Sequence, residues 1–387
     1  MRPTHLLRAA AVAAILFVPP GASAAAPAGR FLYVSARGKD TSRCTQKTPC
    51  RTITRAVARA RKGDTIQVAG GTYHEDVLIT KDVAVVTTAG ATVNATGLVN
   101  GFHIKGRSAA GATIQGFKVK GALFEGILVE STSRVVISDN TVSANNRGAT
   151  APSPTGECKP FGNVPGDCGE GIHLMGVTRS LVGDNTVFGN EGGILLTDET
   201  GPTAHNNISR NQVHGNIEDC GITIAGHSSQ AFANGSPQPK LAGIYDNTIL
   251  QNVSNGNGTK NGGGAGILLA AGGPGAAVYN NLIKDNTANG NGLAGITLHT
   301  HTPNVDLNGN QILDNHVAND GRFGDAEYGE SGTVGILIGS ASVRLSGIEV
   351  RGNQISHVHT GIYTKNVPPL KAKANQFKQV AIHLTQI

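Results

Sequence analysis

The sequence has no tryptophan, and aromatic residues make up only 4% of its 387 residues. Charge is sparse as well. The formal net charge of +6 falls to +4 without Arg2 and Arg8, and that remainder is spread thinly over a long chain. Proteins that bind nucleic acid need a dense basic stripe or a platform of stacking aromatic rings. We therefore expect no nucleic-acid partner, although a weak attraction to acidic polymers stays open.

The sequence also lacks a later run of the about 20 apolar residues that a membrane helix requires. Its amino-terminal segment carries two arginines, a short apolar run over residues 9–18 and small residues near position 24. This pattern is typical of a secretory signal peptide. We assign residues 1–25 to a signal peptide and predict a secreted or periplasmic chain that makes no membrane contact.

Cysteine is scarce, with five residues in all. Cys44 and Cys50 lie six positions apart, and Cys158 and Cys168 bracket a turn of ten positions. Because export favours disulfides, we predict these two local pairs. Cys220 is left over and is predicted to be a buried, inert thiol. The spacing does not resemble a zinc or haem motif.

Glycine, in contrast, is abundant, at 53 residues, and it marks a repeat. Each repeat begins with Gly-Ile-x-Leu, continues through a turn into an apolar run that ends near Asn, and closes with a second apolar run and a polar loop. The spacing between copies varies, mostly in the polar loop. The copies begin at Gly126, Gly171, Gly193, Gly221, Gly266, Gly295, Gly335 and Gly361.

Such self-similarity indicates a solenoid. The short apolar runs alternate as strands do. One repeat cannot bury its own apolar face, so the repeats must stack into parallel sheets with about 4.8 Å between strands. A recurring Asn suits a tight bend after the second strand, because Asn tolerates left-handed backbone angles. We predict that these residues form one internal amide ladder: Asn140, Asn185, Asn247, Asn281, Asn310 and Asn353.

These repeats resemble the right-handed parallel β-helix superfamily, which includes pectate lyases and polygalacturonases. The resemblance covers roughly residues 30–387 and implies an all-β fold, a right-handed parallel β-helix with a short amino-terminal capping helix. Apolar residues at helical spacing between positions 52 and 62 would supply that helix. We expect a single domain over residues 26–387, with a cap (30–75), coils (76–367) and a carboxy-terminal irregular coil (368–387).

The resemblance also implies that a ligand lies along the outside of the first strand, between the variable loops. In each Gly-Ile-x-Leu strand, the residues one and three positions after Gly face the core, and those two and four positions after it face outward. Acids and histidines collect on this outer face and at its ends. The catalytic candidates are Asp219, Glu170, His173, His227 and Asp198, and the substrate-binding candidates are Glu199, Glu218, His299, His301, Glu130 and Lys260.

Carboxylates two coils apart would lie about 10 Å from one another. Inverting glycoside hydrolysis needs roughly 6.5–9.5 Å between acid and base, and histidine accepts protons near neutral pH. We predict a carbohydrate-active enzyme that cleaves a polysaccharide. Asp219 or Glu170 would be the acid, His173 or His227 the base or orienting group, and Asp198 would assist. The acidic groove favours a hydrolase over a lyase.

The segment GNIEDCGITIAG, residues 215–226, is similar to the acidic pair of polygalacturonase-like hydrolases. Its Glu218 and Asp219 would match that pair. The chain departs from that pattern, because it has no Asn-Thr-Asp one coil earlier, no Gly-His-Gly one coil later and no Arg-x-Lys. These departures leave the specific family open.

Other functions stay open at the level of sequence. A lyase acting on a uronate-containing polymer could use Ca²⁺ held by Asp198, Glu199 and Asp219, since carboxylates are the ligands that Ca²⁺ prefers. His299 and His301 are two positions apart on one strand, so both side chains would lie on the same face and could bind a metal ion together. A non-catalytic carbohydrate-binding protein, a periplasmic accessory protein or a purely structural solenoid would also fit the repeat. The oligomeric state is undetermined.

Overall fold

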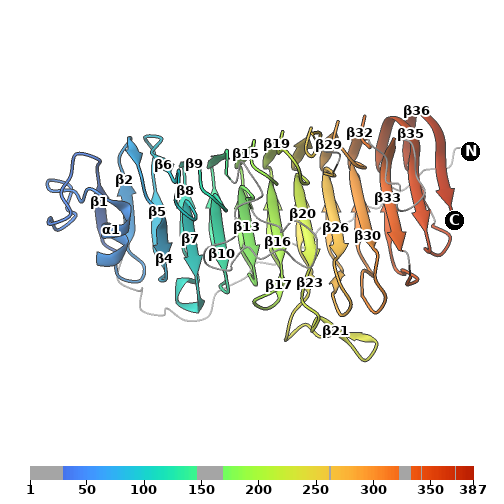
Figure 1. The fold of residues 1–387 in the computed structure, drawn as a ribbon, viewed down its shortest axis with the longest axis horizontal. Coiled ribbons are helices and arrows are strands. Elements are labelled where there is room, and N and C mark those ends of the chain that lie inside the picture. Colours follow the sequence, from blue (N-terminus) through green and yellow to red (C-terminus); the bar gives the residue numbers. More distant parts are fainter. Residues whose placement is uncertain (1–28, 146–168, 261–262, 322–332, 341, 371) are drawn as a thin grey trace, which may run out of the picture.

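The computed structural model describes residues 29–145, 169–260, 263–321, 333–340, 342–370 and 372–387. Figure 1 shows these residues as one long stack of coils that runs from the amino-terminal to the carboxy-terminal end. Each coil contributes a strand to each of three faces, and neighbouring coils pair in parallel. The predicted parallel β-helix is therefore confirmed.

The first face consists of the strands that carry the Gly-Ile-x-Leu signature and their equivalents in earlier coils. They are β4 (Val77–Ile79), β7 (Phe102–Lys105), β10 (Ile127–Glu130), β13 (Ile172–Met175), β16 (Ile194–Thr197), β20 (Ile222–Gly226), β26 (Ile267–Ala271), β30 (Ile296–Thr300), β33 (Val334–Ser340) and the end of β35 (Gln354–Lys365).

The second face is an 11-stranded sheet. It consists of β1 (Phe31–Val34), β2 (Thr65–Val68), β5 (Ala84–Val86), β8 (Thr113–Gln115), β11 (Val136–Ser138), β14 (Leu181–Gly183), β18 (Asn207–Ser209), β24 (Thr248–Leu250), β28 (Leu282–Lys284), β31 (Gln311–Leu313) and β34 (Glu349–Arg351).

The third face continues into the first through β35, which turns the corner between them without a break. It consists of β3 (Thr72–Tyr73), β6 (Thr92–Asn94), β9 (Lys118–Lys120), β12 (Thr141–Ser143), β15 (Thr186–Phe188), β19 (Gln212–His214), β25 (Val253–Asn255), β29 (Thr287–Asn289), β32 (His316–Ala318), the start of β35, and β36 (Gln376–Gln386), which pairs along β35.

Shorter elements lie in the turns between the first and second faces. They are the 3-10 helix η1 (Arg107–Ala109), the three-stranded sheet of β17 (Thr203–Ala204), β23 (Ile244–Tyr245) and β27 (Val278–Tyr279), and the hairpin of β21 (Phe232–Ala233) and β22 (Ser236–Pro237).

The core runs along the axis of the solenoid. Residues one and three positions after each glycine, such as Ile172 and Leu174, point into it and stack in register from coil to coil. This part of the predicted pleat is confirmed. The residues two positions after each glycine were expected to be exposed on the outside of the first face. In the structure Leu128, His173 and Leu195 are no more than 3% exposed. These first-face side chains are therefore largely shielded from solvent.

The asparagines form three ladders rather than one. The first lies at the corner between the second and third faces and contains Asn140, Asn185, Asn211, Asn252, Asn286, Asn315, Asn353 and Asn375. The second lies before the second face and contains Asn206, Asn247, Asn281 and Asn310. The third follows the third face and contains Asn145, Asn190, Asn216, Asn257, Asn291 and Asp320. The single predicted ladder is therefore wrong, because its members belong to two corners.

The helix α1 (Ile53–Arg59) caps the amino-terminal end, as predicted, and buries Ile53 and Val57 against the first strands. The Glu75 carboxylate accepts the backbone N–H groups of Ile53 and Thr54 and so satisfies the start of this helix. The predicted irregular coil over residues 368–387 is wrong, because β36 supplies a last regular coil.

The cysteine predictions divide three ways. The Cys44–Cys50 disulfide is present in the cap. Cys220 is a buried free thiol whose pKa burial raises well above its usual value. The predicted Cys158–Cys168 pair lies outside the described residues, as does the predicted signal peptide. Within the described ranges, no helix is long and apolar enough to cross a membrane.

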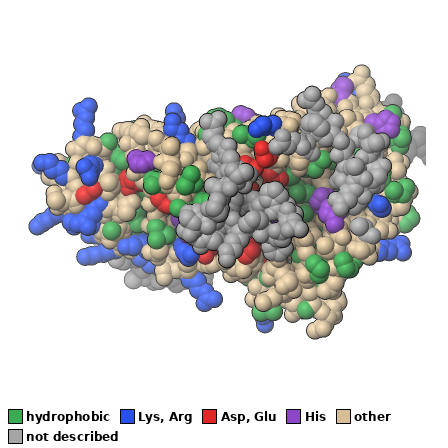
Figure 2. Space-filling view, viewed as in Figure 1, with side chains coloured by type: hydrophobic (Ala, Val, Ile, Leu, Met, Phe, Trp, Pro, Cys, Tyr) green, Lys and Arg blue, Asp and Glu red, His purple; other side chains and the backbone are tan. Residues whose placement is uncertain are grey.

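Positive charge is not spread thinly, in contrast to our expectation. Residues 30–62 contain ten lysines and arginines but only one acidic residue, Asp40. Figure 2 shows these basic side chains projecting from the amino-terminal end of the solenoid, whereas acidic side chains are visible over the middle coils. The molecule therefore has a basic end and an acidic centre.

Candidate functional site

Two predicted carboxylates, Glu170 and Asp219, converge at the start of the first face. Gly192 belongs to the coil between them, and a Cβ atom placed on it would lie 3.0 Å from Glu170 Oε1 and 3.4 Å from Asp219 Oδ2. The two oxygens are therefore at most about 6.4 Å apart, the sum of those distances. This is closer than the coil spacing predicted, because both side chains lean over a residue that has no side chain.

The same place holds a second pair of acids, Glu191 and Glu218. Burial and the neighbouring carboxylates of Glu218 and Asp219 raise the pKa of Glu191 to about 7, although Lys260 opposes this. Two carboxyl groups that share a site cannot both ionise easily, so one holds a proton near neutral pH. Sequence reasoning missed Glu191, even though it stands beside the Gly192–Gly193 pair that opens a repeat. We refer to Glu170, Glu191, Glu218 and Asp219 as the acidic group.

His173 lies on the first face, at the outward position two residues after Gly171. Its Nδ1 lies 3.1 Å from Glu125 Oε1, and its Nε2 lies 2.9 Å from Thr197 Oγ1. Both His173 and Glu125 are buried, and Glu125 Oε2 has no hydrogen-bond partner among the described residues. Sequence reasoning missed Glu125, although it precedes Gly126 just as Glu170 precedes Gly171. Its carboxylate fixes the orientation of the His173 ring.

His227 pairs with Glu199 at the other end of the first face. Its Nδ1 lies 2.6 Å from Glu199 Oε1. Burial disfavours ionisation of Glu199, but the hydrogen bond and charge of His227, together with the charge of His173, outweigh it and lower the pKa of Glu199 to about 2. Glu199 is therefore an anion at every ordinary pH. We call Glu125, His173, Thr197, Glu199 and His227 the histidine group.

Asp198 is placed differently from the other predicted catalytic residues. It is fully buried, and its carboxylate accepts backbone N–H groups from His227 and Ser228 at Oδ1 and from Gly243 at Oδ2. Burial raises its pKa, and these hydrogen bonds oppose that shift. Both carboxylate oxygens are engaged, so Asp198 ties the turn after β16 to the turn after β20.

The remaining predicted residues lie on outlying coils. Glu130 contacts His103 Nε2 at 3.0 Å and Lys105 Nζ at 2.9 Å, and these interactions lower its pKa. The rings of His299 and His301 lie 4.7 Å apart at the end of β30, where burial and the neighbouring ring lower the pKa of His299 to about 3. Neither set joins the acidic group.

The proposed calcium ligands do not come together. Asp219 lies before β20, whereas Asp198 and Glu199 follow β16 at the opposite end of the face, and Asp198 already binds three backbone N–H groups. No set of three or more His, Cys, Asp or Glu residues in the described part of the chain has the arrangement of a metal site.

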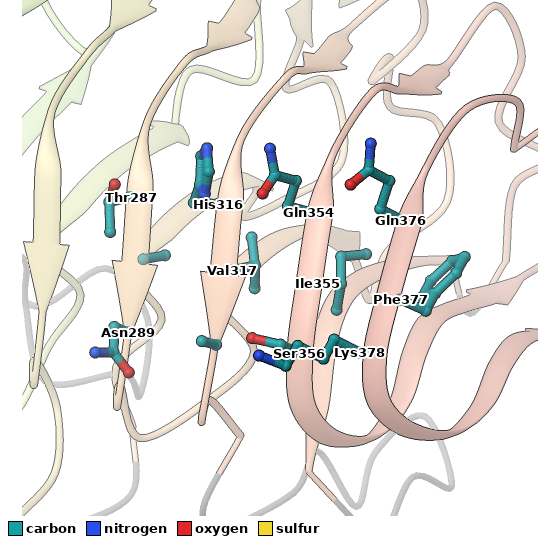
Figure 3. Close-up of a pocket in the computed structure, with 12 residues that line it drawn as sticks. Thr287, Asn289, His316, Val317, Gln354, Ile355, Ser356, Gln376, Phe377 and Lys378 are labelled. Carbon is teal, nitrogen blue, oxygen red and sulfur yellow. The ribbon is translucent and has the colours of Figure 1, made fainter.

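Two hollows lie outside the acidic group, and the second borders the histidine group at Thr200, which follows Glu199. One, of about 310 Å³, lies on the third face across β29, β32, β35 and β36. There Thr287, His316, Gln354 and Gln376 project in a row (Figure 3). The other, of about 600 Å³, lies in the turns after β7, β10, β13 and β16. Neither contains a predicted site residue.

Comparison with known proteins agrees with this architecture. A family described as a right handed beta helix region matches residues 92–236. No curated protein matches the chain. The structure is similar to that of a pectate lyase, at 16% identity over 84% of this chain and 79% of that chain, with a TM-score of 0.55.

Two further structures are similar to a comparable degree. The A-module of a mannuronan C-5 epimerase from Azotobacter vinelandii is 14% identical over 83% of this chain and 88% of that chain, with a TM-score of 0.54. A polygalacturonase from Erwinia carotovora ssp. carotovora is 10% identical over 95% of this chain and 99% of that chain, with a TM-score of 0.54. Likeness at these identities establishes the fold, including its right-handed sense.

Proposed function

Since the chain has the fold of the right-handed parallel β-helix superfamily, we propose that it is a secreted enzyme that cleaves a polysaccharide lying along the first face. The observation that carries this proposal is the acidic group. Its members come from three successive coils and meet above a glycine. Three solved structures with this fold carry the names of enzymes that act on polysaccharides, which supports the substrate class.

The acidic group contains the parts that glycosidic cleavage requires. Glu191, with a pKa of about 7, holds a proton near neutral pH and is suited to protonate the leaving oxygen. Asp219, across Gly192 from Glu170, would act as nucleophile or base. The Glu170 and Asp219 oxygens lie on either side of Gly192, at most about 6.4 Å apart.

The histidine group favours a second candidate, β-elimination from a uronate. A histidine held by a carboxylate can take part in proton transfer, and His173–Glu125 and His227–Glu199 are two such pairs. Under this alternative the acidic group would only bind sugar. Asp198 has an anchoring role under either chemistry, because its oxygens are occupied.

The test is incubation of the purified chain with neutral and uronate-containing polysaccharides, read by mass spectrometry. Saturated fragments indicate hydrolysis, and fragments lighter by one water indicate elimination. We expect Glu191→Gln and Asp219→Asn to abolish turnover, whereas Glu349→Gln, at an exposed ion pair on the second face, serves as the matched control. Full activity in both acidic-group variants would reject hydrolysis at this site.

A further inference from the structure

The amino-terminal end of the solenoid holds more positive charge than the whole molecule. Residues 30–64, which we call the basic cap, contain ten lysines and arginines but two aspartates, a net charge of +8. The chain carries +4 without Arg2 and Arg8, so residues 65–387 carry −4. Figure 2 shows the same separation, with blue side chains around the amino-terminal end and red ones over the middle coils. The molecule is therefore a rod with one positive end and an acidic body.

The two aspartates of the basic cap do not neutralise its surface, because the backbone already occupies them. Asp40 accepts two backbone N–H groups at the start of α1, and Asp64 accepts two more, one just before β1 and one just after α1. Each carboxylate also pairs with one arginine, Arg51 for Asp40 and Arg30 for Asp64. The acids thus hold the cap together and leave most of its cations unpaired.

Seven cations of the basic cap are exposed, and none pairs with an acid anywhere in the described chain. Four of them lie in the loops between β1 and α1: Arg37, Lys39, Arg43 and Lys47. The other three lie at the end of α1 and in the turn after it: Arg59, Arg61 and Lys62. These side chains are available to a negatively charged partner.

The loops that carry the first four cations are held in place. The Cys44–Cys50 disulfide closes the loop that contains Lys47. Tyr33, in β1, donates its backbone N–H to Cys44 O and accepts the N–H of Cys50. Because the surface is already ordered, binding a partner costs little additional conformational entropy.

Phe31 places an exposed aromatic ring beside these charges. It opens β1, the outermost strand of the second face, and its side chain is 60% exposed. The preceding Arg30 reaches the end of α1, where its Nη2 donates to Arg59 O at 3.4 Å. Basic groups next to an exposed apolar ring form the combination that binds interfacial segments to anionic bilayers.

The charge distribution also constrains the shape of the partner. A long soluble polyanion would reach the body of the rod, whose net charge of −4 repels it. A flat anionic surface that meets the rod end-on contacts only the basic cap. The observations therefore favour a plane over a flexible polymer.

We propose that the basic cap binds the surface of an anionic phospholipid bilayer end-on, with its seven unpaired cations on lipid phosphates and Phe31 at the acyl boundary. The first face then stands away from the bilayer and stays open to its ligand. This contact is peripheral, and it departs from our sequence-based expectation of no membrane contact, which rested on the lack of a spanning segment. The inference does not depend on the proposed function.

Sedimentation with lipid vesicles tests the proposal. The protein is residues 26–387, which include every coil described and leave out the apolar run over residues 9–18, whose own affinity for lipid would mask that of the cap. We expect binding to vesicles of mixed phosphatidylglycerol and phosphatidylcholine but not to phosphatidylcholine alone, and weaker binding as salt rises. The variant R37Q/K39Q/R43Q/K47Q should bind the mixed vesicles about a hundredfold more weakly.

The matched control is K240Q/R344Q/K373Q/K378Q, which removes the same charge from exposed positions in the carboxy-terminal half. We expect this control to bind the mixed vesicles as the native chain does. Thermal melting of each variant verifies that the fold is intact. Equal loss of affinity in the two quadruple variants would overturn the proposal, because attraction would then follow net charge and not the basic cap.

Two further measurements complete the test. Phe31→Ala should lower affinity for mixed vesicles several-fold without lowering the melting temperature, because the ring is exposed. Unchanged affinity would exclude the ring from the contact. Long-chain polyphosphate is the comparison ligand, and capture of polyphosphate without binding to mixed vesicles would reject the bilayer in favour of a soluble polyanion.

Discussion

The titration of Glu191 is the most informative property at the scale of single residues. Its pKa of about 7, against an ordinary value of 4.5, means that the folded chain binds an extra proton between those pH values. The folded state therefore loses stability relative to the unfolded state as pH rises through that window. Activity that needs this proton should also decline as pH rises above about 7.

Glu191→Gln should remove that pH-dependent loss. We expect the variant to melt at the same temperature as the native chain, or lower, at pH 4.5, and at a higher temperature at pH 8. Differential scanning fluorimetry across this range checks the expectation. A melting difference that does not vary with pH would show that Glu191 does not titrate in this window.

Asp198 gives a second residue-scale prediction. Replacing it with Ala would leave three backbone N–H groups of two turns without their acceptor. Each such loss costs about 1–3 kcal/mol, so we expect a decrease of about 3 kcal/mol or more in the free energy of unfolding. Urea denaturation measures it, with Asp246→Ala, an exposed aspartate in the described chain, as control. A change below 1 kcal/mol would exclude the anchoring role.

These residues show how far sequence can specify a site. The sequence placed Glu170 and Asp219 on one face, because both precede Gly-Ile strands, but it predicted about 10 Å between them. It did not show that both side chains lean over Gly192. Glu125 and Glu191 were missed because attention went to outward strand positions, although both stand just before a repeat. The distances of Glu125 and Glu191 from the other site residues depend on how the coils align. Loops of variable length make that alignment hard to derive from the sequence.

At the scale of elements, the asparagine ladders explain why coil register was only partly predictable. Asp139-Asn140 and Asp246-Asn247 look alike in sequence, yet they occupy different corners. Coils that contain β17, β23 or β27 carry an extra strand before the second face, and so an extra bend that also uses Asn. Local residue preference is the same at both bends, so only the pairing of whole coils distinguishes them.

The ladders predict that the loss of stability on replacing an asparagine depends on its position in the ladder. Asn252 is buried, donates to Ile208 O and Asn286 Oδ1, and accepts from Asn211. Asn375 ends the same ladder and is only partly buried. We expect Asn252→Ala to lower the free energy of unfolding by about 2–3 kcal/mol and Asn375→Ala by about 1 kcal/mol or less. If denaturation experiments gave equal losses of unfolding free energy for the two variants, burial would not determine how much each asparagine of the ladder stabilises the fold.

At the scale of the whole molecule, the solenoid is a linear stack in which each coil contacts only its neighbours. Stability in such a stack is close to a sum of local terms, and the ends are the weakest points. The amino-terminal end is protected by α1 and by the Cys44–Cys50 disulfide, which closes a short loop. Exposed lysines and arginines crowd this end, so their repulsion opposes its compactness.

Loss of the disulfide should therefore act locally. Replacing Cys44 and Cys50 with Ser removes a constraint worth about 2 kcal/mol for a loop this short. We expect amide hydrogen exchange to accelerate in β1, β2 and α1 but to stay unchanged in β20 and β26, the sixth and seventh strands of the first face. Added salt should partly restore protection by screening the basic residues. Uniform acceleration along the chain would instead mean that the solenoid unfolds as one cooperative unit, because a change confined to one end could then reach the central coils only through global unfolding.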